Sequence, residues 1–215
     1  MSALAVRLPD GTRLEVPEGS TVLTVAARIG PGLARAAVAG RINGELVDLR
    51  VPVRDDAALE IVTLRDAPSG DVIRHSAEHV MADAVKRLFP AVQIDVGRSD
   101  HAEKFQYDFL TERPFTPEDL ERIEAEMGRI VAEDLPFERE VVDREAARAL
   151  FASLGEELKL SRLEDIPEDD EVTVFRHGGF VDLCRGPHVQ RTSQIGAFKL
   201  LEAAGAYWRG DESNP

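Results

Sequence analysis

Short segments in which apolar and polar residues alternate are typical of the first 63 residues. This period of two predicts strands, at residues 4–9, 12–17, 36–49 and 58–64. Asp10-Gly11 predicts a hairpin turn between the first two strands. A helix is expected over residues 21–30, with Ser20 as its N-cap and Gly30 at its end. The order predicts a β-grasp, ubiquitin-like module, for which we expect binding or docking rather than catalysis.

Helical periodicity replaces this alternation after residues 65–72, whose Pro, Ser and Gly predict a linker. Helices are predicted over residues 74–89, 115–134 and 144–154. Thr116 is the expected N-cap of the second helix, with Pro117 at its first position and Asp119 completing a capping box. Asp143 and Gly155 should bound the third helix.

Further strands are predicted at residues 137–142, 157–163, 171–176, 180–184 and 198–209. The fold class expected for residues 64–215 is therefore α+β, with helices on an antiparallel sheet. Together with the β-grasp module at residues 1–63, this gives two domains.

Composition and charge indicate the cellular compartment of the chain. The net charge is −14, and residues 112–171 carry most of it, with 8 Lys/Arg against 20 Asp/Glu. Such a run is typical of the solvated outer face of helices. A single cysteine rules out an internal disulfide framework, and we expect neither a secretory signal nor a membrane span. These features favour a cytoplasmic protein.

Two pairs of side chains could carry chemistry. His75 and His79 are four residues apart, so they share one face of the predicted helix. The apolar stripe of that helix lies on the opposite side, so the pair points away from the helix's own core. Cys184 and His188 are also four residues apart, and Gly186-Pro187 between them fixes the loop.

Three chemistries fit these four groups. They could hold zinc, as four ligands or as three and a water. They could equally hydrolyse a bond without metal, because a neutral imidazole can take a proton from water. A nucleophilic Cys–His pair is the third option, but no helix N-terminus is predicted at Cys184 to activate the thiol.

Several motifs in one order resemble the N-terminal half of bacterial threonyl-tRNA synthetases: RHSAEHVMADAVKRLFP, YDF, PFTPEDLERIEAEM, DLPFEREVV, VDLCRGPH and AGAYWRGD. The resemblance covers essentially the whole chain. It implies a TGS domain at residues 1–63 and a tRNA-editing domain at residues 64–215. It also implies that the class II catalytic core and the anticodon-binding domain are absent, so the chain should not aminoacylate.

The resemblance implies a proofreading hydrolase that cleaves serine from mischarged tRNA(Thr). A pocket that fits threonine excludes the smaller serine by only ~1–3 kcal/mol, so a second site must finish the discrimination. The partner is then tRNA(Thr) carrying serine at its 3′ end, the parent synthetase is expected to be a homodimer, and no membrane is involved. No cofactor is expected for editing.

Residue roles follow from the same resemblance. His75, His79, Cys184 and His188 match the family's editing constellation, with His75 expected to deprotonate the attacking water. Four further positions match substrate-binding residues: Asp182, Lys159, Tyr107 and Gly97. Asp182 would bind the seryl ammonium or hydroxyl. Lys159 would contact the terminal adenosine or the developing oxyanion.

One loop departs from the family pattern. Residues 97–108 read GRSDHAEKFQYD, in which Arg98 replaces a proline, Gln106 replaces a tyrosine, and the loop is one residue longer. We expect His101 in this loop to be a solvated histidine.

Two rival functions remain open. A zinc-dependent deacylase like the alanyl-tRNA editing domains would use the same His, His, Cys and His. A tRNA-binding or regulatory module without catalysis would rely on the β-grasp domain alone.

Overall fold

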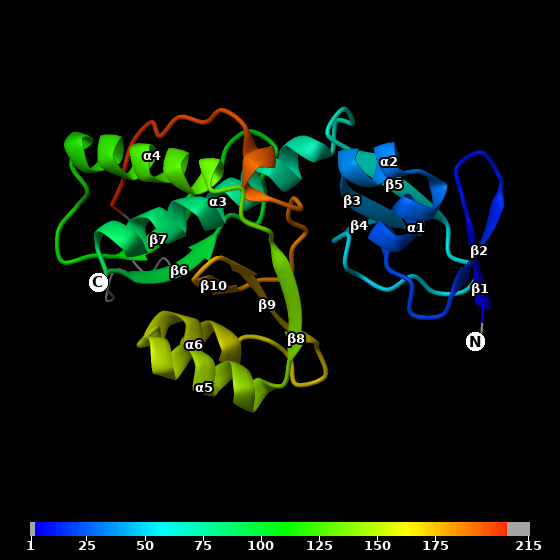
Figure 1. The fold of residues 1–215 in the computed structure, drawn as a ribbon. Coiled ribbons are helices and arrows are strands. Elements are labelled where there is room, and N and C mark those ends of the chain that lie inside the picture. The colour runs from blue at the N-terminus through cyan, green and yellow to red at the C-terminus, as the bar shows by residue number, and fades with distance from the viewer. Residues whose placement is uncertain (1–2, 206–215) are drawn as a thin grey trace.

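A computed structural model describes residues 3–205, and its ribbon forms two lobes (Figure 1). The smaller lobe contains these elements: β1 (Ala3–Arg7), β2 (Arg13–Pro17), α1 (Val22–Ile29), α2 (Pro31–Ala36), β3 (Ala37–Ile42), β4 (Glu45–Val47) and β5 (Leu59–Thr63). β1 and β2 form an antiparallel hairpin, and a three-stranded antiparallel sheet has the order β4-β3-β5. The predicted strands of this lobe are confirmed, whereas the short helix α2 was not foreseen.

Alternate side chains of these strands face α1 and form the core of the small lobe. Its fully buried members are Val6, Val16, Val22, Val25, Ala26, Ala37, Leu49, Val53 and Leu59. The N-cap of α1 is Thr21 rather than the expected Ser20, because the Thr21 hydroxyl accepts from the amide of Thr24 at 3.2 Å. Ser20 is instead buried.

The larger lobe combines four helices with five strands and a short 3-10 turn. These are α3 (Ser69–Leu88), β6 (Gln93–Gly97), β7 (Tyr107–Leu110), α4 (Pro117–Ala132), β8 (Glu138–Val142), α5 (Arg144–Leu154), α6 (Glu157–Glu164), β9 (Val172–His177), β10 (Phe180–Leu183) and η1 (Thr192–Ile195). β6 and β7 form one antiparallel pair, and the second sheet has the antiparallel order β10-β9-β8. The α+β class is thus confirmed.

α3 is the central element of the large lobe. α4 lies along one side of it, and the sheet β10-β9-β8 lies on the other, with α5 and α6 beyond (Figure 1). Between Ser76 and Val85 every residue of α3 is buried. The side of α3 that carries His79 is therefore buried as well as the side that carries the apolar stripe, because a second layer covers it.

Two predicted strands are wrong. Residues 157–163 form helix α6, although the alternation Glu-Leu-Lys-Leu fits a period of two. Leu, Lys, Glu and Arg are strong helix formers, and the buried members Leu158, Lys159 and Leu163 share one helical face. Residues 198–205 have no regular structure, and the rest of the predicted strand, residues 206–209, lies outside the described residues.

The expected linker is also shorter than predicted, since α3 begins at Ser69. The caps of the other two helices are confirmed: Thr116 and Asp119 form the capping box of α4, and Asp143 and Gly155 bound α5. Among the residues that the structure describes, no helix is long and apolar enough to cross a membrane.

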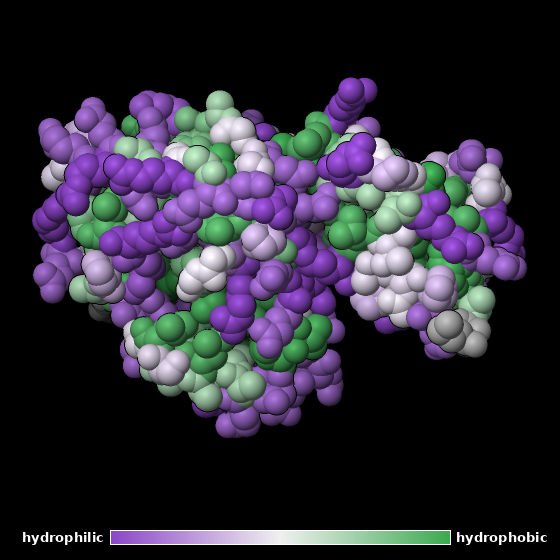
Figure 2. Space-filling view, viewed as in Figure 1, coloured by the Kyte–Doolittle hydropathy of each residue, from purple (hydrophilic) through white to green (hydrophobic). Residues whose placement is uncertain are grey.

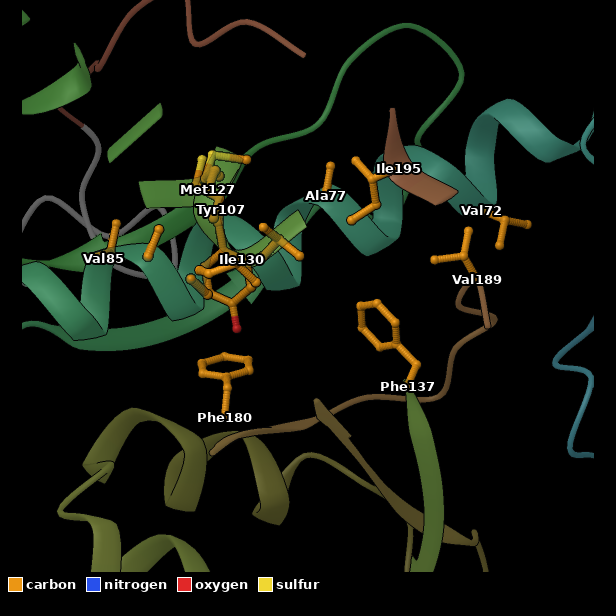
Figure 3. Packing of buried hydrophobic residues seen from close by; sticks show 14 of the residues in the cluster. Val72, Ala77, Val85, Tyr107, Met127, Ile130, Phe137, Phe180, Val189 and Ile195 are labelled. Carbon is orange, nitrogen blue, oxygen red and sulfur yellow. The ribbon is translucent and has the colours of Figure 1, made fainter. Parts of the chain in front are cut away.

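The two lobes share part of one buried cluster. Val38 and Val62 of the small lobe belong to the same cluster as Val72 and Ala77 of α3, and Figure 3 shows Val72 and Ala77 along this helix. The side-chain amide of Gln190 donates to the carbonyls of Ala34 and Ala37 at 2.8 and 2.7 Å. Apolar packing and hydrogen bonds therefore both connect the lobes.

Candidate active site

Helix α3 and the loop after β10 bring the two predicted pairs together. His75 and His79 stand one turn apart on α3, and their ring centroids are 5.5 Å apart. The ring of His188 lies between them, 4.2 Å from His75 and 4.1 Å from His79. Cys184 Sγ is 3.2 Å from His75 Nε2 and 3.3 Å from His188 Nε2. The four side chains thus form one cluster, from segments more than 100 residues apart.

Glycine and aromatic packing shape the loop that carries Cys184 and His188. Gly186 has φ +77, a conformation that favours glycine, and a Cβ there would come within 2.7 Å of the Phe175 ring. The ring of Phe137 stacks on His188 at 5.0 Å, with an interplanar angle of 5°. In Figure 3 Phe137 lies below α3, close to the segment that leads to Val189.

Hydrogen bonds assign the tautomers of two histidines. His75 Nδ1 lies 3.2 Å from the carbonyl oxygen of Pro187, so Nδ1 carries the proton. The Ser76 hydroxyl donates to Val72 O at 2.7 Å, so it accepts from His188 Nδ1 at 3.2 Å. The unprotonated Nε2 atoms of His75 and His188 therefore both face the Cys184 sulfur.

Burial keeps these two imidazoles neutral. Desolvation lowers the pKa of His75 and outweighs the opposing effect of the Glu78 carboxylate. Burial, together with the neighbouring His79 and His75, lowers the pKa of His188 well below its ordinary value. A neutral imidazole with a free Nε2 can accept a proton from water, which is the requirement for a general base near pH 7.

Asp182 is the centre of a second, fully buried network. Its Oδ1 lies 2.5 Å from Lys159 Nζ, its Oδ2 accepts from the Tyr107 hydroxyl at 2.5 Å, and His79 Nε2 is 3.5 Å away. Tyr107 belongs to β7, and its hydroxyl points toward Phe180 of β10 (Figure 3). Lys159 Nζ also contacts the Tyr107 hydroxyl at 2.7 Å.

This network shifts the pKa values of Asp182 and Tyr107 in opposite directions. Burial alone raises the pKa of the Asp182 carboxyl, but the Lys159 ammonium and His79 outweigh it and hold that pKa below its ordinary value. Burial and the Asp182 carboxylate raise the pKa of Tyr107 well above 10. Asp182 is thus an ionised carboxylate beside His79. Three of the predicted substrate residues, Asp182, Lys159 and Tyr107, contact one another.

The fourth, Gly97, lies against the buried carboxylate of Glu78. A Cβ at Gly97 would lie 2.0 Å from Glu78 Oε2. Glu78 accepts hydrogen bonds from the amides of Arg98 and Gln106 at 3.2 and 2.9 Å, and its Oε2 is 2.9 Å from His101 Nε2. Glu78 therefore holds both ends of the unusual loop.

The expectation that His101 is a solvated loop histidine is wrong. Its ring lies 4.6 Å from that of His75, Glu78 holds its Nε2, and Arg74 donates to its backbone oxygen. Sequence reasoning also missed Ser76 and Glu78. A signal existed, because both are polar residues within an apolar helix, beside His75 and His79.

Among the described residues 3–205, two sets of side chains could hold a metal ion. His75, His79, Cys184 and His188 bring one ligand atom each within 4.8 Å of one another, and His75, Glu78 and His101 form a second such set. In the first set the Sγ–Nε2 separations are near the ~3.5 Å expected between two ligands of one tetrahedral zinc. In the second set, the Glu78 carboxylate already accepts hydrogen bonds from the amides of Arg98 and Gln106 and contacts His101 Nε2.

Comparison with known proteins agrees with this architecture. Residues 4–63 match the family described as TGS domain, and residues 172–215 match the family described as threonyl and alanyl tRNA synthetase second additional domain. The chain thus has a TGS domain followed by the additional domain of these two synthetases.

Curated relatives of the chain are threonine--tRNA ligases. The chain is 50% identical over 212 residues to threonine--tRNA ligase of Burkholderia lata, 49% over 214 residues to that of Pelobacter propionicus and 52% over 209 residues to that of Methylococcus capsulatus. These alignments cover 97–100% of this chain but 33% of each relative. The expected resemblance to the N-terminal region of threonine--tRNA ligase, with its TGS and editing domains, is therefore confirmed.

Proposed function

We propose that this chain hydrolyses the ester of serine mischarged onto tRNA(Thr). The observation that carries the proposal is the His75, His79, Cys184 and His188 cluster, in which two neutral imidazoles direct their unprotonated Nε2 atoms at the Cys184 sulfur. The similarity to threonine--tRNA ligases supplies the substrate class. In this proposal the chain acts in the cytoplasm, as part of a parent synthetase that is a homodimer.

The chemistry is attack by water on the seryl ester. His75 Nε2 takes a proton from the water as its oxygen forms a bond to the carbonyl carbon. When the tetrahedral intermediate collapses, the bond to the ribose oxygen breaks, and the imidazolium returns the proton to that oxygen. The products are serine and tRNA with a free terminal hydroxyl. In this mechanism Cys184 and His188 line the pocket, and Cys184 forms no covalent intermediate.

The substrate contacts follow from the buried network. We place the seryl ammonium or hydroxyl on Asp182, which must exchange one of its present donors for the ligand. Tyr107 and Lys159 border that position, and Lys159 would contact the terminal adenosine or the oxyanion. Threonine is rejected because its extra methyl overfills the pocket, at a cost of about 1–3 kcal/mol.

Deacylation of Ser-tRNA(Thr) and Thr-tRNA(Thr), measured side by side, tests substrate, reaction and discrimination together. We expect hydrolysis of the seryl ester and a much slower loss of the threonyl ester. A chain that binds tRNA but leaves the seryl ester intact at high protein concentration would instead be a binding or regulatory module. In this proposal, joining threonine to tRNA belongs to parts of the relatives that lie beyond the aligned third.

The same four side chains would hold zinc in the rival mechanism. There the ion would polarise the ester and its bound water, while the proposed mechanism needs no cofactor. Deacylation is therefore compared with and without a chelator. Unchanged activity supports the metal-free reaction, and complete loss restored by zinc contradicts it.

His75→Ala tests the general base. We expect deacylation to fall by at least about 10²-fold, the low end for loss of such a group. Lys104→Ala, on an exposed position of the neighbouring loop, is the control and should keep the parent rate. Undiminished activity of His75→Ala would remove this histidine from the mechanism.

A further inference from the structure

Asp48 belongs to the TGS domain but hydrogen bonds to the backbone of the candidate active site. It follows β4 and is only 2% exposed. Its Oδ2 accepts from the backbone amide of His188 at 3.0 Å. Its Oδ1 accepts from the amide of Arg50 at 2.9 Å, and the Arg50 guanidinium contacts both oxygens at 3.0 Å.

Arg50 extends the same contact to the packing around His188. Its Nη2 donates to the carbonyl of Phe137, whose ring stacks on His188, and to the carbonyl of Val189 at 3.4 Å. The TGS domain thus holds the amide of His188 through Asp48. Through Arg50 it also holds the carbonyls of Phe137 and Val189.

The editing domain holds this segment as well, since His75 Nδ1 donates to the carbonyl of Pro187 at 3.2 Å and the Phe137 amide donates to the carbonyl of Gln190 at 2.9 Å. Ser76 contacts the His188 ring at Nδ1 and accepts from the Val189 amide at 3.0 Å. The buried His188 amide donates to Asp48. Loss of that acceptor would leave a buried donor unpaired, which costs more than the bond itself contributes.

We propose that Asp48 is a positioning residue for His188 and, through it, for Cys184. By bonding the His188 amide and fixing Arg50 against Phe137 and Val189, it keeps His188 Nε2 directed at the Cys184 sulfur. The TGS domain is then a structural part of the hydrolytic site.

Alkylation of Cys184 by iodoacetamide tests this geometry directly, because the chain has no other cysteine. In Asp48→Ala the segment of residues 185–189 opens more often, so we expect alkylation to be about tenfold faster. Asp48→Asn keeps an oxygen for the His188 amide and should restore the rate to within about threefold. Glu15→Ala removes an exposed carboxylate of the same domain and should match the parent.

An activity measurement deepens the test but rests on the proposed function. Asp48→Ala should lower kcat for seryl-tRNA deacylation by about tenfold with KM unchanged, since Asp48 is not at the surface. If the parent proves inactive, the alkylation result still decides the inference, so the two failures are distinguishable.

A folded Asp48→Ala variant, judged by circular dichroism, that alkylates at the parent rate would overturn the proposal. If Asp48→Ala does not fold, Arg50→Met decides in its place. That variant keeps the Asp48 acceptor but loses the contacts to Phe137 and Val189. Faster alkylation of it supports the proposal, and the parent rate contradicts it.

Discussion

At the scale of single residues, the site depends on buried carboxylates and the polar groups that contact them. Glu78 and Asp182 are buried carboxylates that contact His101 and His79 respectively, and each has at least three polar contacts. A buried charge without such partners would be costly. Gly97 contributes by having no side chain, which leaves room for the Glu78 carboxylate. We therefore expect this glycine to act first through packing.

Gly97→Ala tests this packing. Its Cβ would overlap Glu78 Oε2, so the variant should lose about 1–3 kcal/mol in the free energy of unfolding, measured by urea denaturation. Gly128→Ala is the matched control, since a Cβ there meets nothing within 4 Å and the position is within α4. It should gain about 0.5–1 kcal/mol. Equal stability of Gly97→Ala and the parent would contradict the proposed role of this glycine.

At the scale of elements, α3 carries the largest share of the site. It supplies His75, Ser76, Glu78 and His79 within one and a half turns, so a single helix presents groups to both buried networks. α6 adds Lys159 to the Asp182 network, with Lys159 Nζ 2.5 Å from Asp182 Oδ1. α4 supports α3 along its length (Figure 1).

The capping box of α4 gives a prediction at this scale. Thr116→Ala removes the acceptor for the Asp119 amide at 3.2 Å, so the free energy of unfolding should fall by about 1 kcal/mol. Ser153→Ala, an exposed helical position on α5, should change it by less than about 0.5 kcal/mol. A Thr116→Ala variant as stable as the Ser153→Ala variant would show that the cap contributes nothing.

At the scale of the whole molecule, the hydrophilic surface over α4 lies apart from the buried histidines. The surface over α4 is mostly hydrophilic (Figure 2), as expected for the acidic run of residues 112–171, while the histidines face the interior. Four of the five histidines belong to one cluster, with His177 the exception. Proton uptake by His75 and His188, whose pKa values burial lowers, therefore opposes folding of the molecule as a whole.

The stability of the fold should consequently decrease in mild acid. The pKa values of His75 and His188 are lowered in the folded state, so the unfolded chain binds more protons below pH 6.5. Their contribution is fully present above pH 6.5 and is lost as the pH falls, at up to about 1.4 kcal/mol per pH unit for each histidine. Urea denaturation at pH 7.5 and 5.5 measures the loss.

His188→Asn provides the comparison, because its amide can still contact Ser76 but does not titrate. The free energy of unfolding of this variant should depend less steeply on pH than that of the parent. The same slope in both proteins would mean that His188 is not a source of the acid sensitivity.

The sequence alone determined the β-grasp lobe, most helices and their caps, and the four groups of the cluster. These follow from local patterns: alternation, helical period, turn residues and spacings of four. The tertiary structure decided what depends on contacts between distant segments. It placed Lys159 of α6 beside Asp182, placed His101 beside His75, and brought Asp48 of the first lobe to His188. No local pattern encodes such contacts, because each joins residues far apart in the chain, and burial rather than propensity selects them.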